Sequence, residues 1–295
     1  MSTAREQESG LKRWGVVKKL LHNFVDKLFF GDSSVVLKEF PDSFIQCVIT
    51  SPEYYGNQRW KKTTLPEMIE AQTKVFSECY RVLKDGGVMF VNVNDVFDKN
   101  TKEYLNYPFR LELAIRELGF KCPQPIIIWK RDTALVNKSR LQDIWEYILV
   151  FSKTLRPKFD KNKILVPAKY DKKRRLDKTG TATKACPNMW TINKTFSNGK
   201  SHKKVHSCPF PQKLVENCLL LSTDPGDIVL DPYMGSATSC YVANTMGRKY
   251  IGVEISKEYY DDAVKNMEHC SSVMNSSEYE LKGLSSLQKS FLDGE

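Results

Sequence analysis

The chain has 295 residues, of which 41% are hydrophobic and 11% aromatic, enough for a globular protein with a sizeable core. No run approaches the roughly 18 consecutive apolar residues of a membrane span, and the N-terminus has no apolar signal-peptide segment. We therefore expect an intracellular protein that is not secreted, cytoplasmic or nucleoid-associated, without a membrane partner.

The net charge of +10 is concentrated in one segment. Between residues 153 and 204, sixteen Lys and Arg residues against three Asp residues give +13, which leaves the remainder slightly acidic at −3. A basic segment on a near-neutral body indicates a polyanionic partner, most simply a nucleic acid. A solvated insertion without regular structure is the alternative interpretation.

Eight cysteines are scattered along the chain, and none forms a CxxC pair. Several lie inside apolar patterns, where a cysteine behaves as a small hydrophobic residue, so we expect reduced structural thiols. His202, His206 and Cys208 have a spacing that is compatible with zinc ligands, but a fourth ligand is missing. We therefore expect no metal.

In chain order, hydrophobic periodicity predicts strands that alternate with helices. An amphipathic basic helix is expected over 11–28, and the last 25 residues are Ser-rich and expected to be frayed. The predicted strands are 27–31, 45–50, 88–93, 126–129, 146–151, 228–231 and 250–254, and the other predicted helices are 65–83, 109–118, 212–222, 237–246 and 256–269. This alternation predicts an α/β fold with a doubly wound, mainly parallel sheet.

Two strand ends carry residues suited to chemistry. The run 228–239 reads IVLDPYMGSATS: a strand ends in Asp231, and Gly235 lets the backbone approach a ligand closely, with Ser236 or Thr238 as the helix cap. Asp231 suits a cationic group, and Glu254, at the end of the next strand, suits ribose hydroxyls. Together they describe a site for S-adenosylmethionine, although acids at strand ends are common.

The other strand end is Ser51-Pro52-Glu53-Tyr54, which follows the predicted strand 45–50. An exocyclic amine of a base is a poor nucleophile, because its lone pair is delocalised into the ring. The Ser51 hydroxyl and the Pro52 carbonyl can accept hydrogen bonds from its two N–H groups and so free the lone pair, while Tyr54 offers a face to a flipped base. Taken alone, this tetrapeptide is better explained as an ordinary polar turn between a strand and a loop.

In this order, the two motifs resemble those of the β-class amino-methyltransferases of DNA, in which [DNS]-P-P-[YFW] precedes DP-[FY]-x-G-[ST]-G-T. The resemblance runs from about residue 27 to 269 and includes the segments 31–33, 83–91, 127–130, 146–153, 206–214 and 250–254. It breaks at the basic segment, where the family keeps its variable target-recognition region.

The resemblance implies a Rossmann-like methyltransferase fold with circularly permuted motifs, S-adenosylmethionine as cofactor, no metal, and double-stranded DNA as substrate. It places Asp32 near the cofactor adenine. It also implies a restriction endonuclease as a functional rather than physical partner. The residues implied for catalysis are Ser51, Pro52, Glu53 and Tyr54. Those implied for cofactor binding are Asp32, Phe210, Pro211, Asp231, Pro232, Gly235, Ser236, Thr238 and Glu254.

Serine in the first position of the tetrapeptide is typical of the family's N4-cytosine members, whereas aspartate is typical of its N6-adenine members. We therefore expect methylation of N4 of cytosine; an N6-adenine or RNA-base enzyme and a catalytically silent DNA-binding relic are the alternatives. Two residues depart from the family pattern. Glu53 replaces the usual second proline, and Ala237 replaces a glycine, which we expect to be tolerated if that position is helical.

These features predict five regions: a helical N-terminal extension (1–26), a catalytic half (27–152), a basic target-recognition insertion (153–205), a cofactor-binding half (206–270) and a tail (271–295).

Overall fold

The computed structural model describes residues 24–56, 62–98, 100–130, 141, 144–167, 183–192 and 211–274. The helix expected over 11–28 lies outside this part of the chain, except for its last residues, which form a turn and the start of a strand. The described elements are β1 (Lys27–Phe30), α2 (Ser33–Val36), η1 (Leu37–Glu39), β2 (Ile45–Thr50), α3 (Leu65–Val82), β3 (Leu83–Val93), α4 (Tyr107–Glu117), β4 (Ile127–Lys130), β5 (Trp145–Ser152), η3 (Lys161–Lys163), β6 (Leu165–Pro167), β7 (Thr183–Ala185), β8 (Met189–Thr191), α5 (Gln212–Ser222), β9 (Ile228–Asp231), α6 (Thr238–Thr245), β10 (Lys249–Glu254) and α7 (Lys257–Met274).

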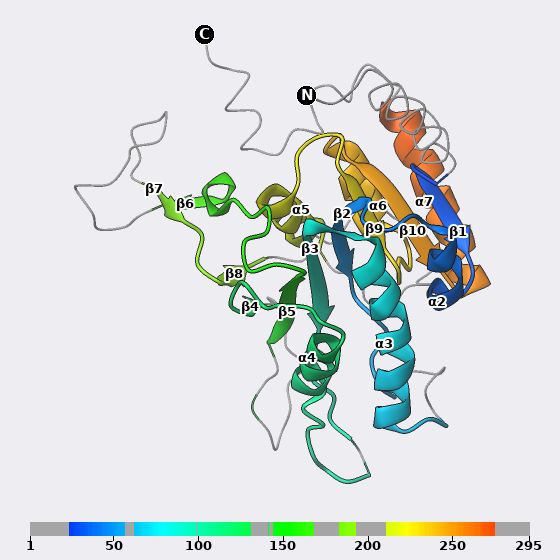
Figure 1. Cartoon of the computed structure of the whole chain (residues 1–295), viewed down its shortest axis with the longest axis vertical. Coiled ribbons are helices and arrows are strands. Elements are labelled where there is room, and N and C mark those ends of the chain that lie inside the picture. The colour runs from blue at the N-terminus through cyan, green and yellow to red at the C-terminus, as the bar shows by residue number, and fades with distance from the viewer. Residues whose placement is uncertain are drawn as a thin grey trace, which may run out of the picture.

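Within the described residues, eight strands form one sheet in the order β1-β10-β9-β2-β3-β5-β4-β8 (Figure 1). The first five strands are parallel, β5 runs antiparallel to both β3 and β4, and β8 is parallel to β4. The sheet is therefore mainly parallel and doubly wound, as predicted. The strands β2 and β9 are neighbours although about 180 residues separate them, and the direction of winding changes between them.

Helices cover both faces of this sheet. Helices α3 and α4 pack on one face, against strand residues that include Val48, and α5 and α6 pack on the other, against residues that include Cys47 and Ile49. Because neighbouring strand residues point to opposite faces, every residue of β2 is buried. This explains why Cys47, Val48 and Ile49 are consecutive apolar residues that do not alternate with polar ones, and why the polar Gln46 and Thr50 of the same strand are buried too.

Helix α3 has a well-defined start. The Thr64 hydroxyl accepts from the Glu67 amide at 3.4 Å, and the Glu67 carboxylate accepts from the Thr64 amide at 2.7 Å, which makes a capping box. Pro66 lies in the first turn, where its missing N–H costs nothing. The buried face of α3 packs on the sheet and also lines the pocket described below.

Most predicted strands and helices agree with the structure to within one or two residues, with three differences. Helix α7 continues to Met274, beyond the predicted end at 269. The stretch 84–87, expected as a break before a strand, belongs to β3, and the pairing of β2 with β3 shifts register there. The third difference lies in the basic segment. Its described parts contain β6 and β7, which form a separate antiparallel pair, and β8, which joins the main sheet.

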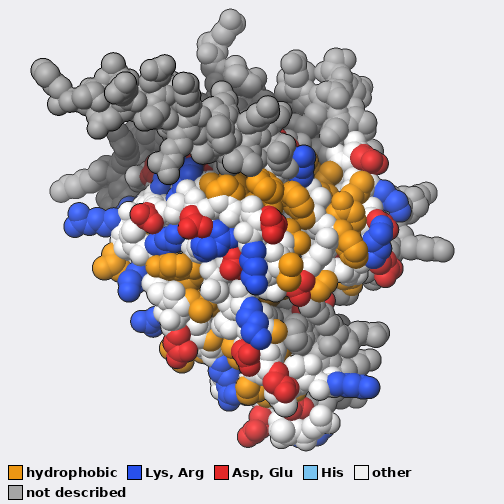
Figure 2. Space-filling view, turned by 45° about the vertical axis from the view of Figure 1, so that its right-hand side comes forward, with side chains coloured by type: hydrophobic (Ala, Val, Ile, Leu, Met, Phe, Trp, Pro, Cys, Tyr) orange, Lys and Arg blue, Asp and Glu red, His pale blue; other side chains and the backbone are white. Residues whose placement is uncertain are grey.

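The described surface is mixed in charge. On the face shown in Figure 2, acidic and basic side chains are interspersed over the described body. Ten of the sixteen Lys and Arg residues of the basic segment fall in 168–182 and 193–204, outside the described residues. Among the helices that the structure describes, none is both long and apolar enough to cross a membrane.

Candidate active site

Four neighbouring parallel strands end at the site. Strand β1 leads to Asp32, β10 ends at Glu254, β9 ends at Asp231, and β2 leads to Ser51. Because all four strands run in the same direction, their carboxyl ends lie along one edge of the sheet. The two motifs that the sequence separates by about 180 residues therefore meet at the point where the winding reverses.

Asp231 joins the two motifs directly. One carboxylate oxygen accepts from the Thr50 hydroxyl at 2.7 Å and from the Tyr233 amide at 3.0 Å, and the other accepts from the Ser239 hydroxyl. The side chain is 1% exposed, and burial raises its pKa to about 6 despite these hydrogen bonds. Asp231 is thus bonded within the protein rather than lining the pocket, and its predicted contact with a cofactor ammonium stays a prediction.

Glu254 and Asp32 organise the other end of the site. The Glu254 carboxylate accepts from the amides of Gly235 at 3.0 Å and Ser256 at 2.8 Å, while burial raises its pKa. Asp32 caps helix α2, and one of its oxygens accepts from the amide and the hydroxyl of Ser34 at 2.9 and 2.7 Å. Both carboxylates are held in place by backbone donors, so their positions are fixed before a ligand binds.

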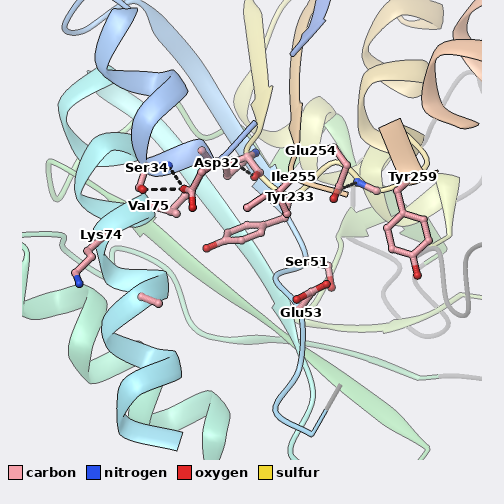
Figure 3. Close-up of a pocket in the computed structure, with 14 residues that line it drawn as sticks. Asp32, Ser34, Ser51, Glu53, Lys74, Val75, Tyr233, Glu254, Ile255 and Tyr259 are labelled. Atoms are coloured by element: carbon pink, nitrogen blue, oxygen red, sulfur yellow. Dashed lines mark hydrogen bonds between the residues drawn. The ribbon is translucent and has the colours of Figure 1, made fainter. Parts of the chain in front are cut away.

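These groups surround a pocket of about 180 Å³ (Figure 3). Six predicted site residues line it, namely Asp32, Ser51, Glu53, Pro232, Gly235 and Glu254. Five others that the structure describes do not, namely Pro52, Tyr54, Asp231, Ser236 and Thr238. Pro211 caps helix α5 and is also absent from the lining, and Phe210 lies outside the described residues.

The catalytic tetrapeptide is tied to the neighbouring strands by a polar network. The Asn92 amide on β3 donates to Glu146 on β5 at 2.8 Å and makes a longer contact of 3.5 Å with the Ser51 hydroxyl. The Tyr54 hydroxyl donates to the same Glu146 carboxylate at 3.3 Å. The Trp129 indole donates to the Asn92 carbonyl oxygen at 2.7 Å, which fixes the orientation of the amide.

The burial of the site and this network raise the pKa of the Tyr54 hydroxyl. Burial raises the pKa of the Tyr54 hydroxyl well above 10, and the nearby Glu146 charge raises it further. The hydroxyl is therefore a neutral donor anchored at Glu146. Its ring lies edge-on to Tyr107, with 6.4 Å between the ring centroids.

Sequence reasoning did not identify Asn92 and Glu146, although both interrupt apolar strands with a polar side chain. It also missed Tyr233 and Tyr259, which line the pocket and offer aromatic surface to a ligand. A polar residue within a buried strand was the available signal, but its partner 54 residues away cannot be read from the pattern.

The turn before helix α6 corrects two predictions. Neither Ser236 nor Thr238 caps the helix; the N-cap is Ala237, and no side chain bonds to the end. Ala237 is not helical, because its φ of 65° lies in the left-handed region, where glycine is favoured. Gly235 adopts φ 52° in the same turn, a left-handed conformation that glycine favours; its predicted close approach to a ligand stays a prediction.

The fold and the site define a class. The chain matches the structure of the PvuII DNA methyltransferase (cytosine-N4-specific), with 25% identity and a TM-score of 0.68 over 84% of this chain and 91% of that one. The Thermus thermophilus protein TTHA0409, solved in complex with S-adenosyl-L-methionine, shares the fold at 24% identity and a TM-score of 0.59, over 82% and 95% of the two chains. The protein thus has the Rossmann-like fold of the methyltransferases.

The particular family follows from the sequence comparisons. A family model described as N6/N4 DNA methylase matches residues 45–265. The type II methyltransferase M.BglII of Bacillus subtilis is 31% identical over 81% of this chain and 68% of its own length. The DNA adenine methyltransferase YhdJ of Escherichia coli (strain K12) is 29% identical over 83% of this chain and 84% of its own length. The chain belongs to the N6/N4 DNA methylase family, whose members act on DNA.

Proposed function

We propose that this protein transfers a methyl group from S-adenosylmethionine to the N4 amine of a flipped cytosine in a short sequence of double-stranded DNA. The observation that carries the choice of base is Ser51, a neutral hydroxyl in the first position of the catalytic tetrapeptide. The PvuII enzyme is named as cytosine-N4-specific, which supports this choice. YhdJ is named as an adenine enzyme, so N6 of adenine is the second candidate.

The cofactor is S-adenosylmethionine, and the pocket residues suit it. Glu254 offers carboxylate oxygens to ribose hydroxyls, and Tyr233 and Tyr259 offer aromatic surface to a nucleoside. An unpartnered buried carboxylate oxygen on Glu53 also favours a ligand that carries positive charge. When bound, the cofactor supplies an electrophilic methyl group on a sulfonium.

The amine is activated by two acceptors at the end of β2. The Ser51 hydroxyl and the Pro52 carbonyl accept hydrogen bonds from its two N–H groups, which pulls the nitrogen toward sp³ geometry and frees its lone pair. Proline fixes φ, so the direction of its carbonyl is set in advance. The network of Asn92 and Glu146 holds Ser51 and Tyr54 in place, and Tyr54 provides the face for the flipped base.

The basic segment provides the proposed DNA contact. Lys and Arg side chains in 153–204 neutralise phosphates, and part of this segment reads base edges. Relatives named as type II methyltransferases support a role in protecting DNA from a restriction endonuclease that recognises the same sequence.

Nucleoside mass spectrometry of DNA incubated with the protein and S-adenosylmethionine tests this function. We expect N4-methylcytosine. N6-methyladenine in its place would show that the second candidate is correct, and a methylated base found only in RNA would overturn the DNA substrate. Cofactor binding without any methylated product over many DNA sequences would identify a catalytically silent relic.

A further inference from the structure

Glu53 is the residue that departs from the family's tetrapeptide. The family usually has a second proline at this position, which carries no charge and fills little of the space beyond the backbone. In this chain a carboxylate replaces it, and its side chain lines the pocket together with Ser51, Glu254 and Tyr259. Figure 3 shows Ser51 and Glu53 together at the same wall of the pocket.

The structure leaves this carboxylate without a full set of partners. The Glu53 Oε2 atom is buried, and it accepts no hydrogen bond from any residue that the structure describes. Its backbone cannot easily move to relieve this, because the Glu53 carbonyl accepts from the Gln72 amide at 3.0 Å. Gln72 is 1% exposed and is itself held by the Tyr107 hydroxyl at 2.8 Å.

The surroundings of Glu53 are acidic. Asp32 and Glu254 line the same pocket, and the cation among the lining residues, Lys74, pairs with Glu70 at 3.0 Å. Burial raises the pKa of Tyr259, and the charge of Glu53 raises it further. A buried acceptor among like charges destabilises the empty pocket unless a cationic ligand compensates.

S-adenosylmethionine carries such a charge on its sulfonium, whereas the product S-adenosylhomocysteine has a neutral sulfur. Direct methyl transfer requires the sulfonium and the target amine to be adjacent, and under the proposed function the amine is held at Ser51. Glu53 lies two residues further along the same wall, so under the proposed function the sulfonium is expected within reach of its carboxylate, whose charge also acts on Glu254.

We infer that Glu53 recognises the positive charge of the methyl-bearing sulfonium and makes the pocket favour the methyl donor over the demethylated product. This inference rests on the proposed function for the position of the amine. It assigns Glu53 to the selection of the cofactor, whereas its place in the tetrapeptide implied a part in catalysis. The proline of the relatives cannot supply this selection, because it has no charge.

Isothermal titration calorimetry of S-adenosylmethionine and S-adenosylhomocysteine tests the inference without DNA. Glu53→Gln keeps the shape of the side chain and removes its charge. We expect it to weaken binding of S-adenosylmethionine about tenfold, as is typical for loss of a partly desolvated charge contact, and binding of S-adenosylhomocysteine less than about twofold. Glu53→Pro, which restores the family residue, should show the same asymmetry.

Glu117→Gln on helix α4 is the matched control, since it changes the net charge equally at a residue outside the pocket. It should affect neither ligand. Equal weakening of both ligands by Glu53→Gln, or no weakening of either, would overturn the inference. The inference would also be overturned if Glu53→Gln bound both ligands as the wild type does but transferred the methyl group more slowly, because Glu53 would then be a catalytic residue. Failure of the wild-type protein to bind either ligand would instead refute the assignment of S-adenosylmethionine as the cofactor.

Discussion

Asp231 connects the end of strand β2, directly before the catalytic tetrapeptide, with the cofactor motif. Its carboxylate receives donors from the end of β2, from the turn after β9 and from helix α6. The sequence predicted Asp231 as a ligand for a cation because it ends a strand, which stays a prediction; the structure shows that its carboxylate also holds the strand ends together. Which neighbouring strand it faces depends on long-range pairing that no local pattern encodes.

The pH dependence of stability tests this arrangement. Burial raises the pKa of native Asp231 from its ordinary value of 3.8 to about 6, so the native state takes up a proton at higher pH than the unfolded state. As the pH falls from 7 to 4, the free energy of unfolding of the wild type should rise relative to that of Asp231→Asn, by at most about 3 kcal/mol. Urea unfolding of both proteins at each pH measures this, and a constant or falling difference would contradict it.

Glu146 acts at the residue scale by positioning Tyr54. It accepts from the Tyr54 hydroxyl and from Asn92, yet it does not line the cofactor pocket. The sequence could locate Tyr54 through its motif, but Glu146 is recognised only when β3 and β5 are seen to be neighbours. Its effect should therefore fall on turnover and leave cofactor binding unaffected.

Glu146→Gln should lower kcat about 10- to 100-fold, because the anchored tyrosine loses its charged acceptor. The dissociation constant for S-adenosylmethionine should change less than about twofold. The pKa of Tyr54 should fall, since the Glu146 charge helps to raise it. Exposed Glu103→Gln is the control for steady-state kinetics and tyrosine titration; equal losses in kcat and binding would indicate general disruption of the site.

At the scale of elements, buried strands and amphipathic helices were predictable because each carries its own periodicity. Helix α3 begins at its capping box and β2 is mainly apolar, so both follow from local sequence. The short strands β6, β7 and β8 have three residues each, too few to show a period, and they form through pairing with partners. Local sequence also does not reveal the conformation of Ala237, which was expected to be helical but occupies a left-handed N-cap.

The capping box of α3 gives a prediction at this scale. Thr64→Ala should lower the free energy of unfolding by about 1 kcal/mol, because the first turn loses its side-chain acceptor. Thr73→Ala, within the same helix, is the control and should be neutral or raise stability by up to about 0.5 kcal/mol, since alanine favours helix more than threonine does. Urea denaturation of the three proteins measures both effects, and equal losses in the two variants would refute the capping role.

At the scale of the whole molecule, the pocket belongs to both halves of the fold. Ser51 and Glu53 come from the catalytic half, and Gly235 and Glu254 come from the cofactor-binding half. The two halves share one continuous sheet through the pairing of β2 with β9. The order of motifs in the sequence predicted this shared fold, and the boundaries of the five predicted regions stay predictions.

Cofactor binding should therefore stabilise the molecule as one unit. At 100 times its dissociation constant, S-adenosylmethionine should add about 2.7 kcal/mol to the free energy of unfolding, which corresponds to a rise in Tm of about 5–10 °C for a chain of this size. Differential scanning calorimetry should show one transition that moves upward. Two separate transitions, only one of which shifts when the cofactor is added, would contradict the expectation that the shared sheet unfolds as one cooperative unit.

The central claim is that Ser51 acts on the target amine while the cofactor is held by other residues. The most direct measurement compares kcat with the dissociation constant for S-adenosylmethionine in the wild type and in Ser51→Ala. We expect kcat to fall at least about 100-fold, because one of two acceptors is removed, while the dissociation constant changes less than about twofold. Equal losses in turnover and cofactor binding, or full turnover without the hydroxyl, would contradict this account.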